Sequence, residues 1–242
     1  ILESRFQIYA IIQQSFNLVD SKAPAKKDAV LVGHSMGGII ARLLVSDADL
    51  TPAAMKLLPN RRVQQFKNDP LFKSRLDIQP IPNFSRAIFL AAPHRGTEFA
   101  DRWFTLAARK VIRLPGAFLG ALTDVIQSSD PDLQAFIKDV DNGLIQNGPS
   151  DLSKNSNFTR LTKNVVPYKG MKFHSIMGNA TKSDDINIIT DDVVPYTSAH
   201  LDGALSEKII KGGHSIQETP EAVLELRRIL RLHLTELGLY KP

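Results

Sequence analysis

The sequence contains no cysteine among its 242 residues. This absence excludes disulfide bonds, metal sites with thiolate ligands and a cysteine nucleophile. It leaves the compartment open, because a chain without cysteine is compatible with both reducing and oxidising surroundings. A nucleophile, if the chain has one, is therefore another side chain.

Long apolar runs are also missing. No stretch approaches the roughly 18 consecutive apolar residues of a membrane-spanning helix, so the sequence predicts a soluble chain. The sequence begins with Ile1 rather than Met, and no signal-like segment is recognised within it. An extracytoplasmic or membrane-associated location is left open.

Signatures of zinc fingers, P-loops and RNA-binding modules are absent, so no nucleic-acid partner, metal or cofactor is expected. With 43% hydrophobic and 23% charged residues the composition is that of a globular protein, and the length suits one α/β domain. The net charge of +5 is spread along the chain. It favours solubility, and the alternative is a mild attraction to anionic membrane surfaces.

The most informative stretch runs from Ala29 to Arg42. An apolar, β-branched run predicts a buried strand, and Gly33-His34-Ser35-Met36-Gly37 follows it as a G-x-S-x-G turn. Helical spacing then resumes, with one side formed by Ile39, Ile40, Leu43 and Leu44. Such a turn holds Ser35 clear of the backbone as a nucleophile, and both Gly33 and Gly37 are expected to be needed for the tight turn. The amide of Met36 is the candidate donor to an oxyanion.

This turn resembles that of the α/β-hydrolases, in particular lipase-like and GPI-inositol-deacylase-like serine esterases. The resemblance implies a three-layer α/β/α sandwich with a mainly parallel sheet and a triad in the order Ser, Asp, His. In that family the nucleophile strand is usually the fifth of about eight, yet fewer than 30 residues precede it here. We therefore expect residues 1–242 to be the C-terminal portion of one hydrolase domain, with the earlier strands and the second oxyanion donor outside this sequence.

Periodicity predicts the remaining elements. A helix over Glu3–Val19 has an apolar side, and further strands are expected at 86–92, 171–177 and 206–211. A last helix begins after Thr219. Its predicted sheet-facing stripe is Val223, Leu226, Leu230, Leu234 and Leu237.

Between about 98 and 167 the pattern is helical without strands. Within it, 101–114 is predicted to be a basic amphipathic helix, which either packs on the sheet or forms a lid beside an acyl pocket. We expect this insertion to be a helical cap. The turn before it, Pro93-His94-Arg95-Gly96-Thr97, resembles the "TPHRGS" turn of lipase-like hydrolases, and its His94 is expected to be structural.

The segment 190–201 resembles the "DGVVP…S…L" motif that carries the triad aspartate. Aligned in that way, Asp191 is the acid and Asp192 stands where a glycine is usual, so both remain candidates. Gly212 and Gly213 lead from the last predicted strand into His214, the expected general base. His200 is the competing base, although it comes before the last strand rather than after it. His174 lies mid-strand and is expected to be packed.

The predicted function is hydrolysis of carboxylic esters by Ser35, His214 and Asp191, with Met36 assisting. The expected partner is a small-molecule or lipid ester, with contact to a lipid interface as an option. Two alternatives stay open: an acyltransferase with the same triad, and a non-catalytic binding protein on a hydrolase scaffold.

Overall fold

The computed structural model describes residues 1–57, 69–98 and 150–241. Its centre is a sheet of four strands in the order β1-β4-β5-β6, in which every neighbouring pair is parallel. The strands are β1 (Ala29–His34), β4 (Phe84–Leu90), β5 (Lys172–Asn179) and β6 (Ser206–Lys211). The four strands predicted from the sequence are thus confirmed, with small shifts at their ends.

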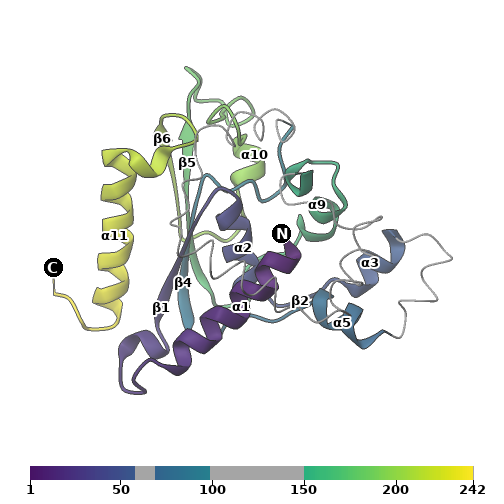
Figure 1. Ribbon diagram of the computed structural model, residues 1–242. Coiled ribbons are helices and arrows are strands. Elements are labelled where there is room, and N and C mark those ends of the chain that lie inside the picture. Colours follow the sequence, from purple (N-terminus) through teal and green to yellow (C-terminus); the bar gives the residue numbers. More distant parts are fainter. Residues whose placement is uncertain (58–68, 99–149, 242) are drawn as a thin grey trace, which may run out of the picture.

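Helices cover both faces of this sheet (Figure 1). The helices α1 (Leu2–Asn17) and α2 (Met36–Leu44) lie on one face, and α11 (Pro220–Glu236) lies on the other. The predicted three-layer architecture is therefore confirmed. Among the described residues, no helix is long and apolar enough to span a bilayer.

Shorter elements join these layers, and the sequence analysis did not predict those between Ala48 and Ile78. They comprise η1 (Pro24–Lys26), β2 (Ala48–Asp49), α3 (Thr51–Leu57), α5 (Pro70–Leu76), β3 (Asp77–Ile78), η2 (Ser150–Leu152), α9 (Asn157–Thr162), α10 (Tyr196–Ala199) and η3 (Ile216–Glu218). Strands β2 and β3 pair antiparallel as a separate small sheet.

The expected cap falls mostly outside the described residues, and the helix predicted at 101–114 lies there entirely. The described end of that range, from Ser150 to Pro167, contains η2 and α9. Leu152, Phe158 and Leu161 from this part are buried in the large apolar cluster that also holds α1 and α2 side chains. This end of the range is part of the main core.

Alternation along the strands divides the core into two clusters. Ala87 and Phe89 of β4 point into the cluster beneath α1 and α2, whereas Ile88 and Leu90 point toward α11. A strand buried on both faces reads as a continuous apolar run, which explains why β4 was visible in the sequence.

The buried face of α11 differs from the predicted stripe. Ala222, Ile229 and His233 are buried against the sheet. Val223 is 53% exposed, and Leu230 and Leu234 are each 39% exposed. Leu226 packs against the cluster between α11 and the sheet, as predicted. The prediction was wrong for Val223, Leu230 and Leu234, because apolar residues occur on several sides of this helix and periodicity alone does not select the face that meets the sheet.

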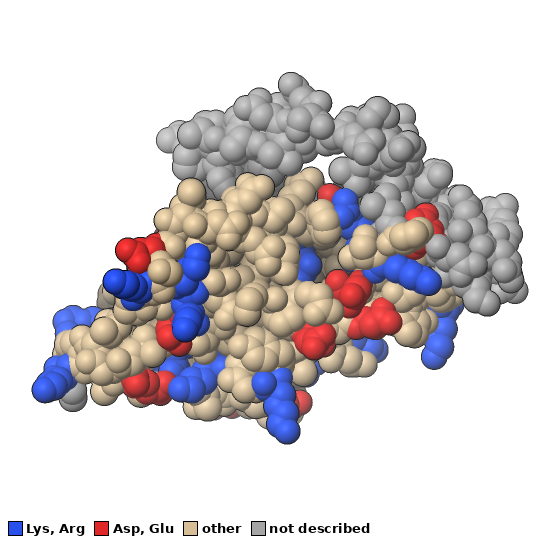
Figure 2. Space-filling model, turned by 90° about the horizontal axis from the view of Figure 1, so that it is seen from below, with Lys and Arg blue, Asp and Glu red and all other residues tan. Residues whose placement is uncertain are grey.

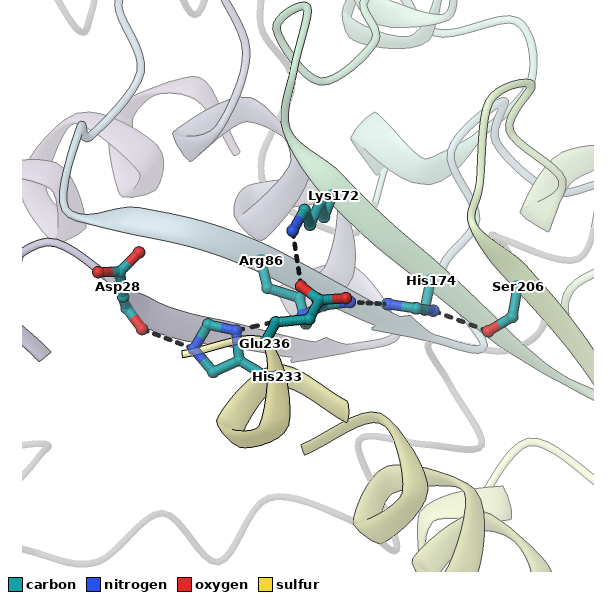
Figure 3. Close-up of polar contacts among 7 residues, drawn as sticks. All are labelled: Asp28, Arg86, Lys172, His174, Ser206, His233 and Glu236. Atoms are coloured by element: carbon teal, nitrogen blue, oxygen red, sulfur yellow. Dashed lines mark hydrogen bonds and ion pairs between the residues drawn. The ribbon is translucent and has the colours of Figure 1, made fainter. Parts of the chain in front are cut away.

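A network of polar side chains determines which face of α11 packs against the sheet. Arg86 of β4 is fully buried and donates to His233 Nδ1 at 3.3 Å and to Glu236 Oε2 at 2.6 Å, both on α11 (Figure 3). His233 Nε2 in turn donates to the carbonyl of Asp28, 2.7 Å away, just before β1. Because a buried guanidinium is costly unless it is paired, α11 turns its polar partners inward.

His174 of β5 completes this network. The Arg86 guanidinium lies 2.6 Å from His174 Nε2, and because it can only donate, Nε2 accepts while Nδ1 donates to Ser206 Oγ at 2.7 Å. The ring is therefore neutral. Burial, followed by the charge of Arg86, lowers the pKa of His174 to about 4. His174 is 1% exposed, which confirms the prediction of a packed histidine.

This arrangement predicts acid sensitivity. An unfolded His174 titrates near 6.5, whereas the folded one titrates near 4, so the unfolded chain binds more protons between these values. Its contribution to stability is complete above about pH 6.5 and is lost as the pH falls toward 4. Urea unfolding between these limits measures a slope of up to about 1.4 kcal/mol per pH unit from this group.

The His174→Gln variant tests the assignment, because glutamine does not titrate in this range. The other charged groups near the ring, Arg228, Glu225 and Glu236, are unchanged in it. We expect the variant to have a flatter dependence of the unfolding free energy on pH. An identical slope in both proteins would contradict the role given to His174.

On the face shown in Figure 2, the charged side chains are distributed over the surface rather than gathered into one patch. In Figure 2, Lys and Arg side chains are interspersed with Asp and Glu over the described residues of the face shown. The net charge of +5 is therefore not gathered into one cationic area on that face.

Candidate active site

Ser35 lies in a strained turn between β1 and α2. Its φ of 54° and ψ of −127° are values that a residue with a side chain rarely adopts. Ser35 is the N-cap of α2, yet its hydroxyl makes no capping hydrogen bond. The turn directs Oγ away from the helix and toward His214 instead.

Two glycines permit this turn. A Cβ on Gly33 would lie 2.5 Å from the carbonyl oxygen of Gly37, and a Cβ on Gly38 would overlap the Cβ of Ala92. A Cβ on Gly37 would meet nothing within 4 Å. The expectation that Gly37 must lack a side chain was therefore wrong. The close contact behind α2 is made by Gly38, where the helix packs on the turn after β4.

Alanine substitutions separate these glycines. Gly33→Ala and Gly38→Ala are each expected to lower the free energy of unfolding by about 1–3 kcal/mol, because backbone must move to admit the methyl group. Gly37→Ala, the matched control, is expected to leave it unchanged or raise it by up to about 1 kcal/mol, since alanine favours a helix. Urea unfolding of the three variants measures this order, and a Gly37→Ala variant as unstable as Gly33→Ala would contradict it.

His214 lies between Ser35 and Asp191. Its Nε2 is 2.8 Å from Ser35 Oγ and its Nδ1 is 2.8 Å from Asp191 Oδ2. A carboxylate accepts, so Nδ1 carries the hydrogen and Nε2 is left to accept from the serine hydroxyl. This tautomer is the one that a serine nucleophile requires.

Asp191 is held by main-chain donors. It is 1% exposed, and its Oδ1 accepts from the amides of Val193 at 2.9 Å and Val194 at 2.6 Å. The sequence analysis did not identify these amides, although a carboxylate followed by a tight turn is a signal for them. Asp192 is exposed, and its φ of 73° explains why a glycine would suit this position.

Met36 is the first residue of α2. Amides in the first turn of a helix have no acceptor within the helix, and the helix dipole adds partial positive charge there. Its amide is thus a donor at the residue that follows Ser35.

The other histidines considered from the sequence do not contact Ser35. His200 Nδ1 and Nε2 bind Glu207 and Asp202 at 2.8 and 3.1 Å. These two carboxylates raise the pKa of His200 against the opposing effect of its burial. His94 is 2% exposed and packs edge-on against Phe89, and burial holds its pKa well below the ordinary value. Its expected structural role fits this position.

Ser35, His214 and Asp191 follow β1, β6 and β5 at the same edge of the sheet, where the carboxyl ends of the parallel strands meet. In the part of the chain that the structure describes, no group of three or more His, Cys, Asp or Glu side chains is arranged to hold a metal ion. The arrangement can activate a hydroxyl by removing its proton.

Comparison with known families agrees with the fold. The sequence model described as "Alpha/beta hydrolase family" matches residues 9–226, which is most of the chain. The chain belongs to the α/β-hydrolase family. Membership of this α/β-hydrolase family supports a hydrolase-type function, while no curated protein gives a significant match.

Solved structures with similarity to this α/β-hydrolase include a Bacillus licheniformis lipase, BlEst2. The mature form is 17% identical with a TM-score of 0.39, covering 91% of this chain and 70% of that chain. Its propeptide form is 17% identical with a TM-score of 0.41, covering 91% of this chain and 38% of that one. Tomato methylketone synthase I is 13% identical with a TM-score of 0.34, covering 93% and 77%. These values are too low to carry an inference about substrate.

Proposed function

We propose that this α/β-hydrolase cleaves carboxylic esters of the lipase or esterase type through an acyl-enzyme on Ser35. The observation that carries the proposal is the continuous pair of hydrogen bonds from Ser35 Oγ to His214 and from His214 to Asp191, each 2.8 Å long. A buried carboxylate, a correctly oriented imidazole and a hydroxyl in a strained turn form a chain that serves acyl transfer.

In the first half of the reaction, Ser35 Oγ attacks the ester carbonyl carbon as His214 Nε2 takes the hydroxyl proton. Asp191 stabilises the imidazolium that forms. The negative charge passes to the carbonyl oxygen, where the amide of Met36 donates to it. The bond to the leaving alcohol then breaks, and His214 returns the proton to the alcohol oxygen.

In the second half, water replaces the alcohol. His214 removes a proton from water as the water oxygen attacks the acyl carbon. The bond to Ser35 Oγ then breaks, His214 protonates that oxygen, and the carboxylic acid leaves. The enzyme returns to its starting state.

Placement in the lipase-like, GPI-inositol-deacylase-like branch remains a prediction, because the matching family model extends to α/β-hydrolases in general. The motifs around His94 and Asp191 support it. A lipid ester as substrate, a cap within the part of 98–167 that precedes Ser150, and contact with a lipid interface are part of the same proposal.

Ser35→Ala is the first test. With the nucleophile removed, we expect hydrolysis of p-nitrophenyl esters to fall by roughly 10⁴-fold or more, and a fluorophosphonate to label the original protein on Ser35 but not the variant. Peptide mass mapping locates the adduct. Labelling elsewhere, or unchanged hydrolysis by the variant, would contradict the proposal.

The same assay separates the alternatives. A panel of esters of rising chain length, with and without a lipid interface, reports the substrate. Transfer of the acyl group to an added alcohol in preference to water would indicate an acyltransferase, and a folded protein that never labels would indicate a binding scaffold.

The two neighbouring aspartates provide a matched pair. Asp191→Asn is expected to lower kcat by about 10³- to 10⁴-fold, because the amide no longer stabilises the imidazolium or the required tautomer of His214. Asp192→Asn removes the same charge from the neighbouring residue, whose side chain is exposed. This variant is expected to keep kcat within about twofold of the original value. Steady-state kinetics on one ester compares them, and equal losses would reject Asp191 as the acid.

A further inference from the structure

His34 links β1, the strand that precedes Ser35, to the loop that carries His214. It is the last residue of β1 and is paired with Leu90 of β4, so the sheet fixes its main chain. Its Nε2 lies 3.0 Å from the carbonyl oxygen of His214. A carbonyl can only accept, so His34 Nε2 carries the hydrogen and donates it.

The loop that receives this hydrogen bond contains two glycines. Gly212, with a φ of 155°, and Gly213 separate the end of β6 from His214. Glycines leave the main chain many accessible conformations, so such a loop needs contacts to stay in one of them. A donor fixed in the sheet is suited to restrict the main chain of His214.

We propose that His34 is a positioning residue that holds the main chain of His214 in the place from which its ring reaches Ser35. The proposal rests on the function proposed above. Ser35 and His214 are then joined twice, once through their side chains at 2.8 Å and once through His34 and the His214 carbonyl at 3.0 Å. Rotation of the His214 loop would break both contacts.

A neutral ring suits this role. Burial is the main cause that lowers the pKa of His34, and it outweighs the hydrogen bond to the His214 carbonyl, which raises the pKa. The charge of the His214 ring acts in the same direction as burial. The ring centroids of the two histidines are 5.1 Å apart. A neutral His34 donates to the carbonyl without placing a second positive charge beside the imidazolium that forms on His214 during the reaction.

The test compares His34→Phe, which keeps a ring but has no donor, with His34→Gln, whose amide can donate to the same carbonyl. His200→Phe is the matched control, because it makes the same change at a histidine that does not contact Ser35. His34→Leu is a second donor-free variant in case the phenylalanine variant does not fold. Each protein is assayed with p-nitrophenyl butyrate, and active sites are counted by fluorophosphonate titration.

We expect His34→Phe to lower kcat per titrated site about 10- to 100-fold, with little change in KM or Tm, because the base is displaced by a fraction of an ångström. His34→Gln is expected to recover most of this loss. A purely structural role would instead lower Tm and the number of titrated sites while leaving kcat per site unchanged, and that result would overturn the proposal.

A second readout does not depend on turnover. The proton on His214 Nδ1 is hydrogen-bonded to Asp191, and its NMR signal reports on this contact. We expect the signal to broaden in His34→Phe, because the loop opens to water, and to stay sharp in His200→Phe. If the original protein proves inactive, the proposed function fails, yet this signal still decides the role of His34. An unchanged signal in His34→Phe would overturn the proposal in either case.

Discussion

The close packing of α2 against β1 and β4 is the constraint on which the site depends. Gly33 and Gly38 remove the two side chains that would hold the helix away from the strands. Because the helix then begins directly at the end of the strand, Ser35 is forced to a φ of 54° and its hydroxyl leaves the capping position. The resulting strain, of order 1–3 kcal/mol, is sustained because the buried strand and helix on either side fix the turn.

The sequence was sufficient to predict the elements in which apolar residues follow a clear strand or helix pattern. The nucleophile turn and the four parallel strands follow from apolar or strand-like runs that are each ended by Gly or Pro. Parallel strands place their following loops at one edge, and together with the resemblance to α/β-hydrolase motifs this made Ser35, Asp191 and His214 candidates before any distance was known. The choice between Asp191 and Asp192 was different, because it depends on burial, on the amides of Val193 and Val194 and on the contact with His214, which the structure shows.

Contacts between segments that lie far apart along the chain could not be predicted from the sequence. The face of α11 could not be predicted because leucines surround the helix and the deciding group, Arg86, lies on a strand far away in the chain. The short elements between Ala48 and Ile78 have too few residues to show a period. His34 gave no signal either, since its partner is a main-chain carbonyl contributed by a loop 180 residues later.

The two ends of the sheet are fixed by different polar systems, with apolar packing between them. At the amino ends, Arg86 connects β4 to His174 of β5 and, through α11, to Asp28 before β1. At the carboxyl ends, Ser35, His214 and Asp191 connect the loops after β1, β6 and β5. A slip of β4 by one residue would turn Arg86 into the apolar cluster beneath α1 and α2, away from His174, His233 and Glu236. The network at one end therefore fixes the strand register, and a fixed register is what allows three loops to meet within hydrogen-bonding distance at the other.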